Sequence, residues 1–150
     1  MKRFLAAAAI VVAGLPAWAS SDDIVKVKSF SDVATTMDRL VAAVEGAGAN
    51  VMARVDHAAG AASVDMELAP TQVLIFGNPK IGTQAMQDDP VAGLFLPMKV
   101  LVYRDGAGQT WLAYQNPGDM FDNLAIPDDA GYLKMMTGAL GKLTAKAAGG

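Results

Sequence analysis

The chain has 150 residues, a formal net charge of −3 and no cysteine, and 53% of its residues are hydrophobic. An acidic chain without a basic cluster excludes nucleic acid as a partner and offers nothing to hold an anionic membrane surface. The lack of cysteine excludes disulfides, thiol redox chemistry, cysteine zinc sites and covalently attached haem. The length fits one domain with a sizeable core.

The start of the chain has the pattern of a secretory signal peptide. A basic pair precedes the apolar run Phe4–Leu15, and Ala17-Trp18-Ala19 supplies the small residues of a cleavage site. The run is too short for a permanent membrane anchor. We therefore predict a signal peptide over residues 1–19, cleavage after Ala19, no membrane insertion after cleavage, and a periplasmic location.

The remainder, residues 20–150, is expected to form a single domain with its core roughly over 24–145. The alternating segment Ile24–Phe30 predicts a half-buried strand near a sheet edge. Ser31 is a good N-cap for the helix that follows, and glycines at 46 and 48 end it. Apolar residues recur through that helix at helical spacing, at Val33, Met37, Leu40, Val41 and Val44.

The middle of the chain holds two more strand patterns. Asn50–Asp56 alternates, and Thr71–Gly77 holds an uninterrupted apolar run typical of a central strand. Between them, Val64–Leu68 fits either a helix or a strand. Asn78-Pro79 has the pattern of an N-cap followed by a first-turn proline, which predicts a short helix through Gln87.

The last third begins with a hairpin pattern. Met98–Arg104 and Gln109–Gln115 predict two strands around a glycine-rich turn. Asp128 and Asp129 are expected to cap the final helix. Its core stripe is Tyr132, Leu133, Met136, Leu140 and Leu143. This order predicts an α+β fold, a largely antiparallel sheet with two long helices packed on one face.

Three segments carry a resemblance to a known family. Ala53–Ala59, Pro70–Lys80 and Leu96–Tyr103 resemble the bacterial family called domain of unknown function 302, over roughly 24–145. The resemblance implies a TATA-binding-protein-like fold of β-α-β(4)-α order, in agreement with the pattern. It implies no activity. This chain has Phe95 before the Leu-Pro pair, where the family's pattern often has an aspartate.

His57 is the sole histidine of the sequence and has Asp56, Asp65 and Glu67 nearby. An imidazole there could serve as a general base or as one ligand of a metal or haem. A lone histidine lacks the second nitrogen ligand that most metal sites use, so a hydrogen-bonded structural role is favoured. We predict no metal site and no cofactor.

The turn at Gly77, Asn78 and Lys80 is the candidate ligand-binding site, with His57 expected close by. A helix N-terminus and an ammonium group together can receive an anion. The competing interpretation is that Asn78 only caps its own helix. This interpretation is favoured over an anion site because such caps are common.

Nine methionines invite a copper(I) interpretation, but no Met-x-x-Met or Met-x-Met motif occurs. Met37 and Met136 lie on core stripes, and the adjacent Met135 and Met136 must point in different directions. Methionine as an adaptable core residue is therefore favoured. The sequence also lacks phosphate-loop, dinucleotide-binding and serine-hydrolase motifs, so no catalytic residue is assigned.

The function favoured by these observations is that of an exported soluble domain that binds a small amphipathic or anionic ligand in the periplasm. The alternatives are an accessory protein of the cell envelope that acts through its surface, and a metal- or haem-binding protein that uses His57. The sequence leaves a homodimer open.

Overall fold

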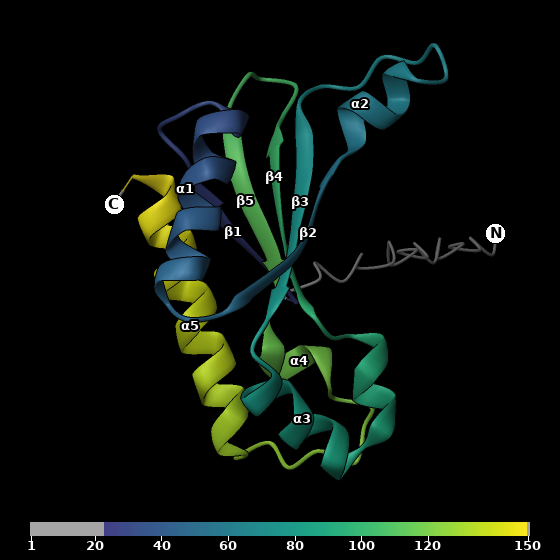
Figure 1. Cartoon of the computed structure of the whole chain (residues 1–150), viewed down its shortest axis with the longest axis vertical. Helices are drawn as coiled ribbons and strands as arrows, with labels where there is room; N and C mark the ends of the chain where they lie inside the picture. Colours follow the sequence, from purple (N-terminus) through teal and green to yellow (C-terminus); the bar gives the residue numbers. More distant parts are fainter. Residues whose placement is uncertain (1–22, 150) are drawn as a thin grey trace, which may run out of the picture.

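The computed structural model describes residues 23–149, so the predicted signal peptide and the cleavage after Ala19 lie outside the described residues. Within residues 23–149 a five-stranded antiparallel sheet has the strand order β1-β5-β4-β3-β2 (Figure 1). The strands are β1 (Ile24–Lys28), β2 (Asn50–Asp56), β3 (Thr71–Gly77), β4 (Met98–Arg104) and β5 (Thr110–Gln115).

Helices connect the strands and end the chain. They are α1 (Val33–Gly46), α2 (His57–Ala62), α3 (Pro79–Asp88), the 3₁₀ helix η1 (Pro90–Leu94), α4 (Pro117–Met120) and α5 (Gly131–Ala148). Among residues 23–149, no helix has the length and apolar character needed to cross a membrane.

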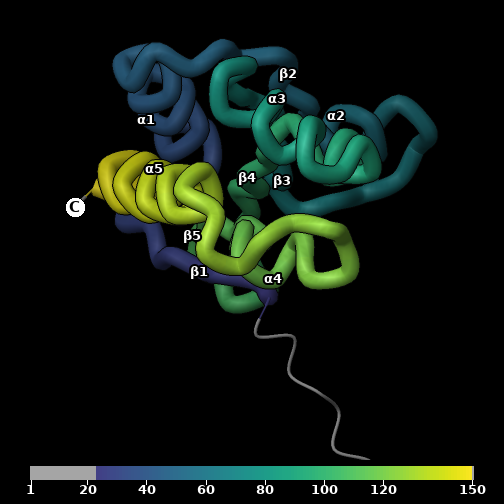
Figure 2. Tube along the Cα trace, turned by 90° about the horizontal axis from the view of Figure 1, so that it is seen from below, coloured from purple at the N-terminus to yellow at the C-terminus, as the bar shows by residue number. Residues whose placement is uncertain are grey.

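The two long helices, α1 and α5, pack against each other and cover the same face of the sheet (Figure 2). The core lies between them and that face, where Leu40, Leu74, Val100, Leu112 and Leu140 are fully buried. Strand alternation explains the pattern, because every second side chain of a strand points to the same face. The predicted α+β fold, with an antiparallel sheet and two long helices on one face, is confirmed. The exact TATA-binding-protein-like order stays a prediction.

The N-caps of the two long helices, α1 and α5, differ from those that the sequence predicts. Asp32 caps α1 by accepting a hydrogen bond from the Thr35 N–H at 2.8 Å, whereas the Ser31 hydroxyl accepts one from Arg39. The residue before α5 is Ala130, which makes no side-chain cap, and Asp129 lies one position too early. An N-cap must stand directly before the first helical residue to reach the free N–H groups.

The undecided segment Val64–Leu68 is neither helix nor strand. It belongs to an exposed excursion between β2 and β3 that contains α2. None of the side chains of α2 is buried.

Candidate functional site

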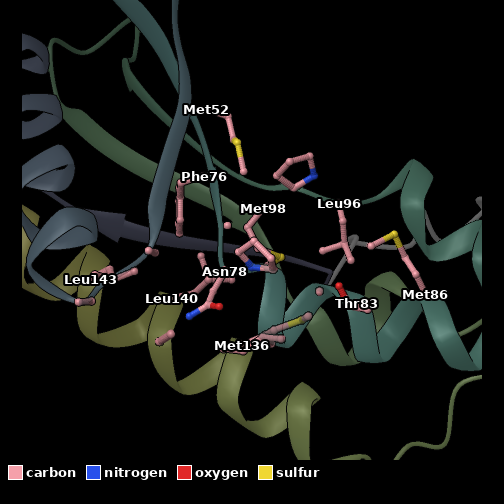
Figure 3. Close-up of a pocket in the computed structure, with 18 residues that line it drawn as sticks. Met52, Phe76, Asn78, Thr83, Met86, Leu96, Met98, Met136, Leu140 and Leu143 are labelled. Atoms are coloured by element: carbon pink, nitrogen blue, oxygen red, sulfur yellow. The ribbon is translucent and has the colours of Figure 1, made fainter.

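An apolar pocket of about 400 Å³ lies at one end of the sheet. It lies where β3 ends and β4 begins, with α3 on one side and α5 on another (Figure 3). Phe76 and Met98 enter it from neighbouring positions on β3 and β4, since these two residues are paired in the sheet. Met136, Leu140 and Leu143 close it from α5.

Four methionines line this pocket: Met52, Met86, Met98 and Met136. They come from four different elements, so no spacing in the sequence could have revealed their meeting. Met52 reaches the pocket because the β2–β3 register shifts between Val51 and Ala53, and an irregularity of this kind redirects a side chain. The predicted core positions of Met37 and Met136 are confirmed, and the neighbouring Met135 is exposed.

The lining contains no ionisable side chain; its polar side chains are those of Asn78 and Thr83. Such a wall supports neither acid–base chemistry nor the burial of a charge. Flexible, polarisable methionine side chains instead adapt to apolar groups of different shapes. The pocket is therefore suited to apolar contact.

The Gly77-Asn78-Lys80 turn lies at the rim of the pocket, and its residues have different roles. Gly77 and Asn78 line the cavity, whereas Lys80 is exposed and outside it. The Asn78 carboxamide oxygen accepts the Lys80 N–H at 3.0 Å, so Asn78 caps α3 itself. One N–H group that an anion would use is thereby already occupied.

His57 does not join this turn. In the β2–β3 pairing, Asp56 lies opposite Gln72 and Asn50 opposite Gly77, so the end of β2 lies at the start of β3. Seven residues of β3 therefore separate His57 from Asn78, about 20 Å along the strand. The expectation that His57 lies close to Asn78 is wrong. The strands β2 and β3 are antiparallel, so their carboxyl ends lie at opposite ends of the strand pair.

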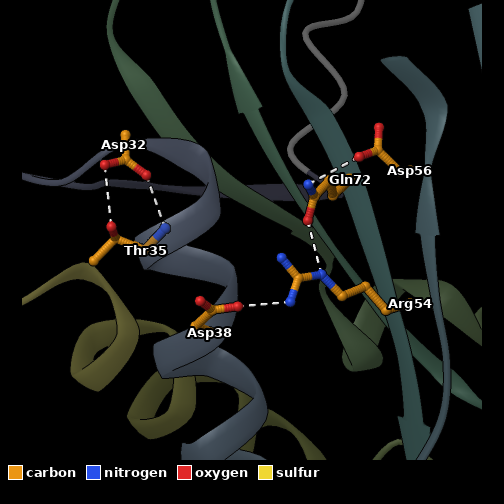
Figure 4. A network of polar contacts seen from close by, with 6 residues as sticks. All are labelled: Asp32, Thr35, Asp38, Arg54, Asp56 and Gln72. Atoms are coloured by element: carbon orange, nitrogen blue, oxygen red, sulfur yellow. Dashed lines mark hydrogen bonds and ion pairs between the residues drawn. The ribbon is translucent and has the colours of Figure 1, made fainter. Parts of the chain in front are cut away.

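His57 instead begins the exposed helix α2, and its neighbour Asp56 caps that helix by accepting the Ala59 N–H at 2.9 Å. Asp56 also accepts a hydrogen bond from Gln72, which accepts one from Arg54, and Arg54 pairs with Asp38 of α1 (Figure 4). In the described part of the chain no three His, Cys, Asp or Glu side chains gather as metal ligands.

The fold places the chain in a class of small α+β domains, and the comparisons name the family. The profile of the domain of unknown function DUF302 matches residues 25–143, so the chain belongs to this family. The structure of an uncharacterized conserved protein DUF302 from Bacillus stearothermophilus superposes with a TM-score of 0.68 at 18% identity. That match covers 86% of this chain and 98% of the other. At this identity the match concerns the fold.

Closer relatives carry a functional name. A protein of Brucella suis named fluoride-specific ion channel FluC 1 is 41% identical over 128 residues, covering 84% of this chain and 50% of that protein. Relatives in Brucella abortus and Brucella melitensis, named fluoride-specific ion channels FluC 1 and FluC 2, are equally similar, with 47% of their length covered. The chain thus spans about half the length of the curated relatives it matches.

These relatives correct the functional prediction. They are named as ion channels, which are membrane proteins, and not as free ligand-binding proteins of the periplasm. The predicted function as a periplasmic ligand binder and the periplasmic location are therefore contradicted. The sequence patterns predict the fold of one domain, and a fold alone does not determine the function of the proteins that contain it.

Proposed function

We propose that this chain functions in fluoride-specific ion transport, as a DUF302 domain that acts on a channel. The observation that carries the proposal is the 41% identity over 128 residues to proteins named fluoride-specific ion channels. The DUF302 family itself names no activity, so this likeness is what favours fluoride over other functions.

We place the ion path in the half of the relatives that this chain does not match, and a regulatory or supporting role in the matched half. Packing supports this division. The apolar faces of α1 and α5 are already buried against each other and the sheet, while charged residues such as Lys134 and Lys142 lie on the exposed side of α5. Helices used in this way are elements of a compact domain.

The pocket of Figure 3 supports action by contact and not by ion binding. A fluoride ion entering it would lose its hydration shell and find no cationic side chain in the lining. An unpaired charge in an apolar cavity is strongly disfavoured. The domain would accordingly alter the channel's opening or assembly without holding the transported ion in this pocket.

The test uses the Brucella suis relative in liposomes, intact and without the 128 residues that match this chain. Fluoride efflux is followed with a fluoride-selective electrode. Removal of the matching segment is expected to change the rate or the onset of efflux by several-fold while fluoride remains favoured over chloride. Adding this full chain to the shortened protein should restore part of the difference.

Equal fluoride efflux with and without the matching segment would overturn the proposal. A host strain from which this chain is deleted provides a second readout, because its growth should become more sensitive to added fluoride. Growth that is equally sensitive to fluoride and to the same concentration of chloride would contradict a fluoride-specific role.

A further inference from the structure

An exposed arm, residues 57–70, leaves the sheet between β2 and β3. Both views show it on the side of the sheet away from α1 and α5 (Figures 1 and 2). Its tip carries large apolar side chains that are mostly exposed: Val64 is 63% exposed, Met66 65% and Leu68 50%. Three such side chains on one exposed segment form the kind of surface that proteins use to bind a partner.

The arm is held in a defined shape by hydrogen bonds. The Met66 N–H donates to the Ala61 carbonyl at 3.0 Å and the Asp65 N–H to the Ala62 carbonyl at 3.2 Å. Asp65 has a φ of +58°, a left-handed conformation that aspartate tolerates better than most residues. At its base, the network through Asp56 and Gln72 ties the arm to the sheet (Figure 4). The arm is thus ordered before it meets a partner.

The same side of the sheet has an apolar surface that neither long helix covers. This open sheet face is defined by the strand residues that alternate with the core: Val73, Leu101, Tyr103, Trp111 and Ala113, with Lys26, Lys28 and Lys99 among them. A hollow of about 240 Å³ lies in it, partly lined by Val73, Lys99, Leu101 and Ala113. These strand positions of the open sheet face carry three lysines and no carboxylate.

We propose that the arm of one chain lies across the open sheet face of a second copy, and that the arm of the second copy lies across the open sheet face of the first. Charge complementarity supports a second copy as the occupant. Asp65 and Glu67 alternate with the apolar residues of the arm. Exposed Lys99 lines the hollow, and exposed Lys26 is paired in the sheet with Ala113, another lining residue. Met66 enters the hollow of the partner copy, and the two carboxylates meet the lysines. A two-fold dimer satisfies both surfaces at once.

The dimer is independent of the proposed fluoride function and has its own test. Multi-angle light scattering of the full chain is expected to give the mass of two chains. The pair Asp65→Lys and Glu67→Lys, and separately the pair Lys26→Glu and Lys99→Glu, should each weaken the dimer about tenfold or more, because like charges across an interface disfavour association. Combining all four changes should restore the dimer.

Two controls keep the test sharp. Lys134→Glu with Lys142→Glu changes as much charge on α5, away from the open sheet face, and should leave the dimer intact. Met66→Ala with Leu68→Ala removes apolar contact without altering charge and should also weaken it. A monomeric wild-type chain, or a dimer indifferent to both charge reversals, overturns the proposal. A monomer that sediments with phosphatidylglycerol vesicles would assign the face to a membrane instead.

Discussion

The Tyr132 hydroxyl joins the start of α5 to the end of α3. It donates a hydrogen bond to Asp88 at 2.6 Å, and the ring is buried. Burial, followed by the hydrogen bond to Asp88 and its negative charge, raises the pKa of Tyr132 to about 12 from 10.0. Because the folded-state pKa is raised, this group's contribution to stability is complete below pH 10 and is lost as the pH rises toward about 12.

Replacing Tyr132→Phe should remove this alkaline loss. We expect the free energy of unfolding of the wild type to fall between about pH 10 and 12 more steeply than that of the variant, in urea titrations followed by circular dichroism. Tyr103→Phe, which removes a hydroxyl from the open sheet face, is the matched control. Parallel pH profiles for wild type and Tyr132→Phe would contradict the assignment.

Individual residues of the candidate site were predictable where the cause is local. The position of Asn78 before Pro79 predicts that it caps α3, and in the structure its side chain does so. The distance to His57 was not predictable from either residue, because it depends on which strand ends meet in the sheet. The four pocket methionines likewise meet through tertiary packing.

The β4–β5 hairpin is organised by one side chain in its turn. Asp105 accepts hydrogen bonds from the Ala107 and Gln109 N–H groups and from the Trp111 indole at 2.8 Å. The Trp111 bond is the main reason that the pKa of Asp105 lies below its ordinary value of 3.8. A depressed pKa means that the carboxylate's contribution is present above pH 3.8 and is lost as the pH falls through the folded-state pKa.

Replacing Asp105→Asn should therefore lower stability at neutral pH and flatten its loss in acid. Tryptophan fluorescence during urea unfolding at several pH values is the measurement, with Asp122→Asn as a control on the exposed surface. If Asp105→Asn and wild type lose stability equally between pH 5 and 2, the turn is held by other contacts.

Elements with a clear hydrophobic period were predictable to within a residue or two. The stripe from Val33 to Val44 gave α1, and the apolar run in Thr71–Gly77 gave β3. The segment Val64–Leu68 was harder, because an exposed segment has no buried face and therefore no hydrophobic period. The N-cap of α1 was predicted at Ser31 and lies one position later, at Asp32. Serine and aspartate are both good N-caps, so the residue type alone does not decide between the two positions.

At the scale of the whole molecule, one hydrophobic cluster joins the helices to the sheet. Leu40 of α1 is completely buried and Phe76 of β3 is 4% exposed, and both belong to this cluster. The sequence predicted this core because both long helices have apolar stripes of the right spacing. This chain spans about half the length of the relatives named as ion channels, so its own residues could not indicate what those whole proteins are.

Because Leu40 and Phe76 belong to the same hydrophobic cluster, truncating either side chain should destabilise the whole domain. Leu40→Ala and Phe76→Ala should each lower the free energy of unfolding by about 2–5 kcal/mol, because each leaves a cavity that its neighbours fill incompletely. Met135→Ala, on the exposed side of α5 at 48% exposure, should change it by less than about 0.5 kcal/mol. Urea unfolding followed by circular dichroism and by tryptophan fluorescence should give one coincident transition in all three variants. Two separate transitions, or a loss below about 1 kcal/mol for both core variants, would mean that helices and sheet do not share a single cooperative core.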